Sequence, residues 1–164
     1  AGLPTWSNLV GMIYKKKSII GMANFPELKK TYISYNNTSY ILDKNKKKKL
    51  KTNSVINFKK TKILCNFHNQ NKNLKILKKL DKLNKNISRI TLDAFSYCLL
   101  AEGKLDAVIE SNLKIYDVAA IIPTVENAGG FITTWNNKNA EKAGNILATS
   151  NKKLHYKLLK ILKN

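Results

Sequence analysis

Residues 105–135, LDAVIESNLKIYDVAAIIPTVENAGGFITTW, decide the fold class of this chain. The run 105–109 is short and mostly apolar, which predicts a buried strand. Asp117 then precedes a nearly continuous apolar segment, which predicts a helix that is buried on most of its faces. The two glycines at 129–130 end this helix, and residues 131–135 begin the next strand. The stretch therefore predicts a strand–helix–strand unit with an acidic residue at the mouth of the helix.

The position of Asp117 allows two interpretations. An acidic side chain at a helix mouth accepts hydrogen bonds from the first amides of the helix, so Asp117 is a candidate helix cap. A carboxylate in the same place also faces outward, where it can hold a metal ion. Local sequence alone favours the cap. Pro123 lies inside the predicted helix and predicts a kink there.

The second part of the chain, residues 58–164, alternates strand and helix patterns. Apolar runs and apolar residues at helical spacing predict, in order, a strand at 61–67, helices at 74–83 and 94–102, a strand at 146–149 and a final helix that contains Leu154, Leu158 and Leu162. His155 lies among the lysines of this last helix, so we expect it to be exposed. The alternation predicts an α/β layer fold.

The first part, residues 1–57, has a different pattern. Four short apolar runs separated by tight-turn residues predict an antiparallel strand meander over 9–14, 18–24, 31–35 and 38–42. The polar stretch 43–57 predicts a loop or linker. The chain is therefore expected to divide into a meander at 1–57 and an α/β domain at 58–164.

Composition excludes several classes of protein. No run of 18 apolar residues exists, which argues against a membrane-spanning helix, and 43% hydrophobic residues suffice for a core. Cys65 and Cys98 lack the spacing of a metal or redox site and are expected to be buried thiols of a cytoplasmic protein.

The net charge of +20 invites a nucleic-acid interpretation. Arg89 is, however, the only arginine among 30 basic residues, whereas base recognition and bidentate phosphate binding favour arginine. The lysines are scattered along the chain together with 21 asparagines. We therefore expect a solvated basic surface and no specific nucleic-acid partner.

A family resemblance is carried by residues 116–120, Tyr-Asp-Val-Ala-Ala, followed by Ala-Gly-Gly at 128–130. This pattern resembles the C-terminal motif of the inositol monophosphatase family. The resemblance extends back through Glu110 and residues 93–103, and it reaches Gly-Leu-Pro-Thr-Trp at 2–6. It implies a layered α/β fold like that of the sugar phosphatases.

Two positions most resemble the histidinol-phosphate phosphatase branch of this family, namely the acid at Asp93 and Tyr116 in place of tryptophan. Leu92 departs from the branch, which usually has glycine before this aspartate. The upstream Asp-Pro-Ile-Asp-Gly-Thr motif and the glutamate pair of the family do not occur in the 164 residues. The sequence is therefore expected to be the C-terminal portion of an enzyme, inactive by itself, with the meander as a remnant of the N-terminal metal-binding domain.

The resemblance implies Mg²⁺-dependent hydrolysis of a small phosphorylated metabolite, and a homodimer is a further expectation. Asp117 matches the C-terminal metal ligand of the family and is the expected catalytic residue. Asp93 and Glu110 match positions that face the part of the substrate remote from the phosphate. Two nearby carboxylates suit a cationic amine or imidazole, which favours histidinol phosphate over inositol phosphate.

Each substrate-binding residue has a structural alternative. Asp93 could cap the helix at 94–102, and Glu110 could face solvent at a strand end. Arg89 is expected to contact the substrate phosphate or to brace a loop. For the whole chain, the alternatives are an inositol-1-phosphate phosphatase, a non-catalytic interaction module and a basic nucleic-acid binder.

Overall fold

The computed structural model of the protein describes residues 2–44, 46–54, 57–67, 70–84, 86–90 and 92–163. The elements are, in chain order, β1 (Asn8–Tyr14), β2 (Lys17–Phe25), β3 (Lys30–Tyr35), β4 (Thr38–Asp43), β5 (Lys46–Lys49), η1 (Phe58–Lys60), β6 (Ile63–Asn66), α1 (Gln70–Leu83), β7 (Ile87–Ser88), α2 (Ala94–Ala101), β8 (Ala107–Leu113), α3 (Ile115–Val118), α4 (Ile121–Glu126), β9 (Phe131–Thr134), η2 (Ala140–Lys142), β10 (Gly144–Thr149) and α5 (Lys152–Leu162).

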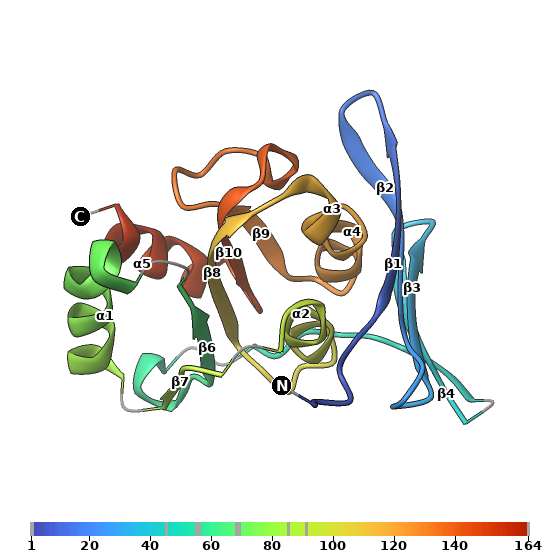
Figure 1. Cartoon of the computed structure of the whole chain (residues 1–164), viewed down its shortest axis with the longest axis horizontal. Coiled ribbons are helices and arrows are strands. Elements are labelled where there is room, and N and C mark those ends of the chain that lie inside the picture. The colour runs from blue at the N-terminus through green and yellow to red at the C-terminus, as the bar shows by residue number, and fades with distance from the viewer. Residues whose placement is uncertain are drawn as a thin grey trace.

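These elements stack in four layers (Figure 1). Helices α1 and α5 form the first layer, and a five-stranded sheet in the order β7-β6-β8-β10-β9 forms the second. Helices α2, α3 and α4 lie between this sheet and a second five-stranded sheet, β1 to β5. The α/β fold class predicted from the sequence is confirmed.

The four predicted meander strands are confirmed as β1 to β4. They pair in sequence order, and every pair is antiparallel. Both residues of each two-residue turn, at 15–16 and 36–37, have positive φ, which gives the twist that tight hairpins need. Lysine and asparagine accept this conformation here although neither turn contains glycine.

The prediction that residues 43–57 form only a loop was wrong for 46–49. These four lysines form β5, which pairs antiparallel with β4 at the edge of the meander. The Lys47 ammonium donates a hydrogen bond of 2.8 Å to the Tyr35 hydroxyl and lies 4.1 Å from the centre of the Tyr40 ring. Cross-strand contacts with these aromatic rings stabilise an edge strand that has no hydrophobic residue, and its charges discourage pairing with other chains.

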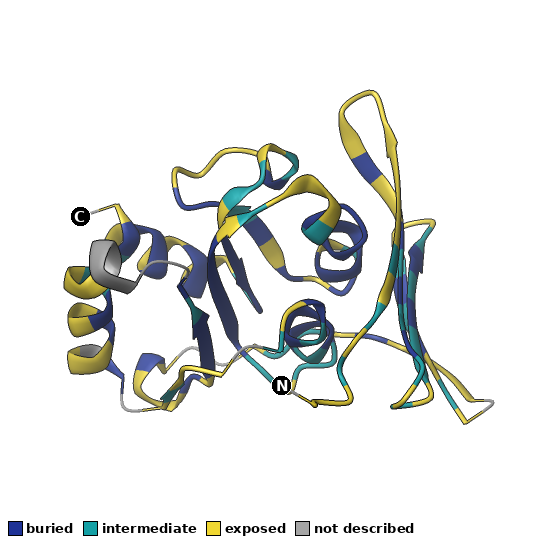
Figure 2. Cartoon of the chain, in the orientation of Figure 1, coloured by how far each residue is buried: buried dark blue, intermediate teal, exposed yellow. Residues whose placement is uncertain are grey.

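The central sheet is mixed. β6 runs parallel to both β7 and β8, whereas β10 runs antiparallel to β8 and β9. Layers cover both of its faces, so β8 is dark blue along most of its length in Figure 2. Burial on both faces explains why the start of β8, residues 107–109, is a continuous apolar run without alternation.

The predicted single helix after Asp117 was wrong. The segment forms two short helices, α3 and α4, with Ala119 and Ala120 between them. Asp117 is the third residue of α3 and not a residue before it. Pro123 is the third residue of α4, in the first turn, where a backbone amide has no helical partner in any case. The proline therefore removes no helical hydrogen bond and does not require the predicted kink.

The two sheets lie on either side of residue 57 in the sequence, but they share a hydrophobic core. Buried side chains of the meander, such as Phe25 and Tyr32, belong to one cluster with residues of α2, α4 and the central sheet. A second cluster lies between the central sheet and helices α1 and α5. The division into domains at 57 stays a prediction.

His155 is 2% exposed, so the expectation of an exposed side chain was wrong. Its two ring nitrogens each lie 2.9 Å from a threonine hydroxyl, Nδ1 from Thr149 and Nε2 from Thr133. Burial lowers the pKa of His155 to about 4.

Cys65 and Cys98 are buried free thiols, as predicted. Among the helices that the structure describes, none is long and apolar enough to cross a membrane.

Two glycines let the meander approach the helices closely. Gly11 and Gly21 are paired across β1 and β2. A Cβ atom at Gly21 would lie 1.9 Å from the carbonyl oxygen of Ala120, and one at Gly11 would lie 2.8 Å from the carbonyl carbon of Ala119. Backbone therefore packs against backbone at the junction of α3 and α4, just after Asp117.

We expect Gly21→Ala to lower the free energy of unfolding by about 3 kcal/mol or more, because a methyl group here forces two backbone segments apart. The measurement is urea denaturation followed by circular dichroism. Met22→Ala is the control on the opposite face of the same strand, where the side chain is half-buried, and we expect a loss below about 1.5 kcal/mol. Equal losses for the two variants would show that the close approach at Gly21 relaxes easily.

Candidate active site

A pocket of about 480 Å³ lies where the first strand of the meander meets the carboxyl end of β8 and the first turns of α2 and α3. Its lining combines carboxylates with amide, hydroxyl and apolar groups from Ser7, Leu9, Asp93, Ala94, Tyr97, Glu110, Asn112, Leu113, Lys114, Tyr116 and Asp117. Three of the four predicted site residues, Asp93, Glu110 and Asp117, therefore lie in one cavity.

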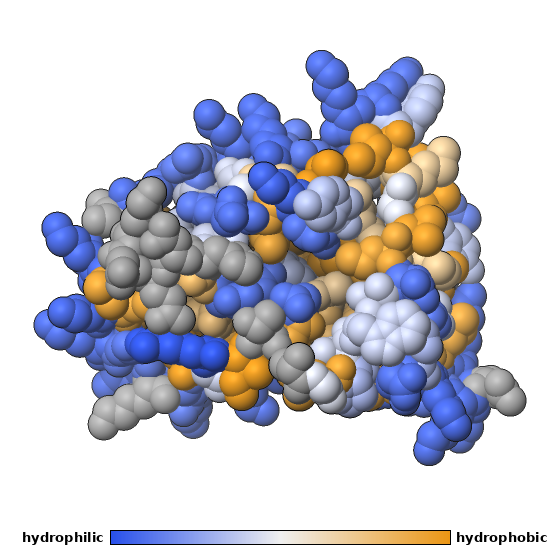
Figure 3. Space-filling model, viewed as in Figure 1, coloured by the Kyte–Doolittle hydropathy of each residue, from blue (hydrophilic) through white to orange (hydrophobic). Residues whose placement is uncertain are grey.

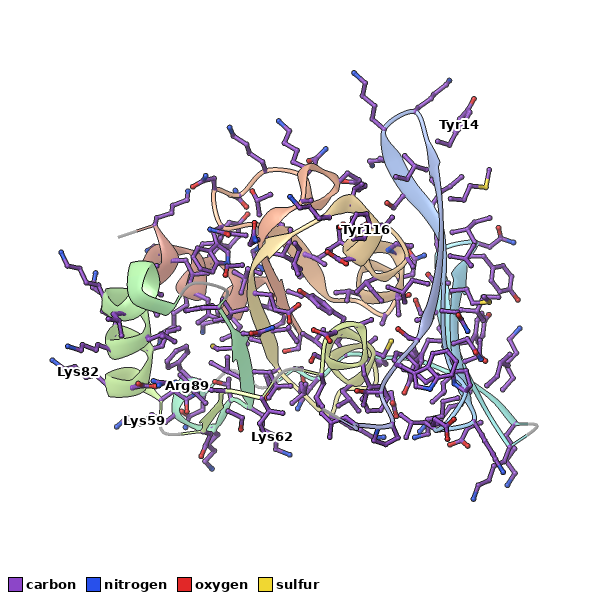
Figure 4. All side chains as sticks on the ribbon, viewed as in Figure 1. Tyr14, Lys59, Lys62, Lys82, Arg89 and Tyr116 are labelled. Carbon is purple, nitrogen blue, oxygen red and sulfur yellow. The ribbon has the colours of Figure 1, made fainter. Side chains whose placement is uncertain are left out.

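Local structure explains how these residues come together. Glu110 lies within β8. Near the end of this strand Asn112 has a positive φ, and α3 begins two residues after the strand ends. Asp117 then lies on the first turn of α3, and Asp93 lies immediately before α2. Tyr116 is 71% exposed on α3, at the mouth of the pocket (Figure 4).

Glu110 is 3% exposed, so the alternative of a solvent-facing strand end is excluded. The Tyr97 hydroxyl donates a hydrogen bond of 2.8 Å to Glu110 Oε2. Asn66, which is paired with Glu110 across β6 and β8, also hydrogen-bonds this carboxylate. Two donors from neighbouring elements therefore fix the orientation of the Glu110 side chain.

Burial raises the pKa of Glu110 to about 7, which the negative charges of Asp93 and Asp117 also favour. The hydrogen bonds from Tyr97 and Asn66 act in the opposite direction, since they stabilise the ionised form. Glu110 is therefore mixed between its neutral and ionised forms at neutral pH. A cation that binds beside it favours the ionised form.

Asp117 is half-buried, and its Oδ2 accepts a hydrogen bond of 2.7 Å from the backbone N–H of Lys114. This bond closes the first turn of α3 and holds the carboxylate still. No hydrogen bond to Oδ1 comes from the described residues. Asp117 therefore stabilises the helix start and can also offer one oxygen to the pocket, so the cap and the ligand role are compatible.

Asp93 precedes α2 but makes no side-chain capping bond. Its backbone has φ 45° and ψ −129°, a conformation that residues other than glycine rarely adopt. Its side chain is exposed and lines the pocket. An unusual backbone conformation at a pocket wall is typical of functional positions, and the missing capping bond weakens the purely structural interpretation of Asp93.

Arg89 does not line this pocket. It forms an ion pair with Asp81 of α1, and both side chains are about half exposed. In Figure 4, Arg89 lies beside one end of α1, in a different part of the molecule from Tyr116. In this structure Arg89 therefore acts as a brace between α1 and the segment after β7.

The sequence analysis missed Tyr97 and Asn66. Tyr97 lies four residues after Asp93, one turn along α2, and this spacing could have indicated that both face the same pocket. Asn66 is the last residue of β6, which pairs in parallel with β8. Its position beside Glu110 therefore depends on the strand order and could not be predicted from spacing.

Mg²⁺ prefers six oxygen ligands in nearly octahedral geometry. Asp117 offers a suitable carboxylate oxygen. Over the described part of the chain, however, no group of three or more His, Cys, Asp or Glu side chains is placed to hold a metal ion. The described residues therefore fit one ligand of a magnesium site and not a complete site.

The raised pKa of Glu110 predicts a pH-dependent gain in stability for Glu110→Gln. A carboxyl group whose pKa is higher in the folded state than in the unfolded state stabilises the fold at acid pH, and this contribution is lost as the pH rises through about 7. We therefore expect Glu110→Gln to unfold with a free energy about 3 kcal/mol higher than the wild type at about pH 8, and with little difference at about pH 4, below the unfolded-state pKa.

The measurement is chemical denaturation of both proteins at the two pH values. Glu27→Gln, at an exposed position in the turn after β2, is the control and should change the free energy of unfolding by less than about 0.5 kcal/mol at both pH values. A difference between Glu110→Gln and wild type that does not vary with pH would contradict the assignment of a raised pKa to Glu110.

Comparison with known proteins agrees with the architecture. An inositol monophosphatase from Zymomonas mobilis superposes with a TM-score of 0.87 at 21% identity, over 99% of this chain and 64% of that structure. The extragenic suppressor protein SuhB from Bartonella henselae superposes with a TM-score of 0.88 at 23% identity, over 99% of this chain and 64% of that structure. At sequence identities this low, the structural similarity establishes the fold alone.

The sequence is 30% identical over 154 residues to the bifunctional phosphatase IMPL2 of Arabidopsis thaliana, a match that covers 91% of this chain and 43% of IMPL2. It is 36% identical over 58 residues to a histidinol-phosphatase of Mycobacterium tuberculosis, over 35% of this chain and 22% of that protein. The chain thus spans less than half the length of both of these relatives. The family model of the inositol monophosphatase family matches residues 1–164. The chain belongs to the inositol monophosphatase family.

Proposed function

We propose that the protein carrying this chain is a magnesium-dependent phosphomonoesterase that hydrolyses histidinol phosphate. The observation that carries this proposal is the convergence of Asp93, Glu110 and Asp117 on one pocket. Family membership supports phosphatase chemistry, and the partial match to a histidinol-phosphatase supports the choice of substrate.

In this proposal Asp117 is a metal ligand. The backbone N–H of Lys114 fixes Oδ2, so the carboxylate keeps its orientation before any ligand arrives. The chemistry that bound magnesium supplies is polarisation of the phosphate ester and activation of a water molecule. The other ligands of a complete magnesium site would come from outside the residues described here.

Glu110 and Asp93 are proposed to bind the part of the substrate remote from the phosphate. Histidinol phosphate carries an amine and an imidazole, and both can be cationic. Burial first, and then the charges of Asp93 and Asp117, disfavour the ionised form of Glu110, and a cation between Glu110 and Asp93 favours it. Tyr97 and Asn66 keep Glu110 pointing at the pocket, so little conformational entropy is lost on binding.

Inositol-1-phosphate is the second candidate substrate. The mixed protonation of Glu110 near pH 7 favours it, since a neutral carboxyl group can both donate to and accept from a hydroxyl. Asp93 would then have no cationic partner. The cytoplasmic location and the possible homodimer stay predictions from the sequence.

Asp93→Ala tests the choice of substrate. If Asp93 pairs with a cation, the variant should lose about 1.5 to 3 kcal/mol of transition-state binding for histidinol phosphate and much less for inositol-1-phosphate. The measurement is kcat/KM for both substrates with wild type and variant, in the enzyme that contains this chain and its remaining metal ligands.

Asp43→Ala is the matched control, because Asp43 lies at the end of β4 and is absent from the pocket lining. It should leave kcat/KM unchanged for both substrates. Equal losses on the two substrates for Asp93→Ala would sink the assignment of histidinol phosphate and leave Asp93 with a structural role only.

A further inference from the structure

A second pocket, of about 450 Å³, is nearly as large as the candidate active site and shares no lining residue with it. It lies between the start of β2, the turn that joins β3 to β4, and the carboxyl end of α4. Beside three asparagine side chains, its lining brings together one ammonium, one carboxylate, one hydroxyl and an apolar wall that includes Ile20 and Pro123; the charged and hydroxyl groups belong to Lys17, Glu126 and Ser18. Nothing in the proposed phosphatase chemistry uses these residues.

The charges of the pocket are separated. Glu126 and Lys17 act on each other electrostatically, yet no ion pair joins them in the described structure. Burial raises the pKa of Glu126, the Glu141 carboxylate raises it further, and Lys17 lowers it. Glu126 is exposed at the pocket and has no ion-pair partner among the described residues, although the protein carries a net charge of +20.

Ser18 adds a second, independent observation. Its side chain is 8% exposed, and its Oγ has no hydrogen-bond partner among the described residues. The Ser18 backbone N–H, in contrast, donates a bond of 3.0 Å to Glu141 Oε1. Buried hydroxyls are nearly always hydrogen-bonded, so an orphan hydroxyl at a pocket wall points to a partner that the described residues do not supply.

The apolar wall limits the ligand further. Ile19, Ile20 and Pro123 line the same cavity, and both isoleucines are about 40% exposed. Figure 3 shows hydrophobic surface, in orange, next to the lysine-rich tip of the hairpin formed by β1 and β2. A ligand with an apolar group therefore buries surface that is now in contact with water.

We propose that this pocket binds a small zwitterion, a free α-amino acid with an apolar side chain. The ligand's ammonium pairs with Glu126, its carboxylate pairs with Lys17, and its side chain packs against Ile20 and Pro123. A simple anion would meet the Glu126 carboxylate, and a simple cation would meet the Lys17 ammonium. Only a ligand with both charges matches both groups.

The first test is calorimetric titration of the protein with L-leucine, which needs no phosphatase activity as a readout. We expect a dissociation constant on the order of 1 mM, typical of a ligand of this size with two charge-assisted contacts. N-acetyl-leucine lacks the ammonium and leucinamide lacks the carboxylate, so each should bind about tenfold more weakly or worse. Equal affinity for the three compounds, or no binding of L-leucine at about 10 mM, would overturn the proposal.

Variants locate the site. Glu126→Gln and Lys17→Gln should each weaken L-leucine binding about tenfold or more, and Glu126→Gln should also abolish the preference for L-leucine over N-acetyl-leucine. Asp117→Asn, in the other pocket, is the control and should leave the affinity unchanged. Since both charge variants lie at the surface, circular dichroism is expected to show an intact fold. Loss of binding in Asp117→Asn but not in Glu126→Gln would place the amino acid in the candidate active site and refute the proposed pocket.

Discussion

Replacing Asp117 by asparagine in the enzyme that contains this chain is expected to lower kcat for phosphate release by about 10³-fold or more, with the fold intact. Asparagine keeps a side-chain oxygen that can accept the hydrogen bond from Lys114 N–H, so the first turn of α3 is preserved. It removes the negative charge with which a carboxylate holds Mg²⁺.

The experiment compares kcat, its dependence on magnesium concentration and the melting temperature for wild type and Asp117→Asn. Asp43→Asn is the matched control, with the same chemical change outside the pocket. We expect the two variants to melt within a few degrees of the wild type and only Asp117→Asn to lose activity. Near wild-type turnover of Asp117→Asn at ordinary magnesium would mean that Asp117 only stabilises the start of α3.

Much of the fold could be predicted because hydrophobic patterning specifies elements locally. The meander strands and the helix α2 follow from apolar runs, turns and the glycine after the helix, all of which act within a few residues. The strand β5 could not be predicted in this way, because the contacts that stabilise it join Lys47 to Tyr35 of β3 and Tyr40 of β4. Tertiary contacts here override a composition that is unfavourable for strands.

Glu110 shows a different source of error. The apolar run ends at Ile109, which allows a strand end at Glu110 as the structural alternative to substrate binding, but β8 continues to Leu113. Its pairing with β6 and β10 extends past the apolar run and takes Glu110 into the interior. A polar residue inside a strand that has neighbours on both sides is therefore a stronger signal of function than one at a strand end.

The burial of His155 could have been found from the sequence. His155, Leu158, Leu159 and Leu162 follow the spacing of one helix face, and all four are buried. Two threonines on the adjacent strands then satisfy the imidazole. The lysines around His155 suggest an exposed surface, and this charged composition hides the helical spacing of the buried residues.

The candidate site could be predicted only in part. Asp117, Asp93 and Glu110 are separated by up to 24 positions, and only the family resemblance suggested that they meet. The rarity of Arg89 leaves two roles open, a contact with the substrate phosphate and a loop brace. Its ion pair with Asp81 of α1 depends on how α1 lies beside the segment after β7, which no local pattern reveals. The spacing of residues in the sequence predicts which side chains are neighbours within one helix or strand. Contacts between different elements can be predicted only when the arrangement of those elements is known.

The second large effect concerns the 164-residue chain by itself, which we expect to have no magnesium-dependent phosphatase activity. Asp117 is one candidate ligand, and within the described residues no cluster of three potential ligands completes a metal site. Hydrolysis assisted by metal ions needs the phosphate and the attacking water to be held at the same site, and one carboxylate cannot assemble it.

The measurement is phosphate release from histidinol phosphate by the purified chain over a range of magnesium concentrations, with circular dichroism to establish that the chain is folded. The enzyme that contains this chain and the missing ligands is the positive control. Addition of L-leucine provides a second check, since the pocket at Glu126 lies within the chain and should bind it whether or not the chain is active. Magnesium-dependent release of phosphate by the folded chain would contradict the prediction. The metal site would then have to include residues of the chain outside the described ranges. A folded, inactive chain whose enzyme counterpart is also inactive would instead favour a non-catalytic interaction module derived from the family.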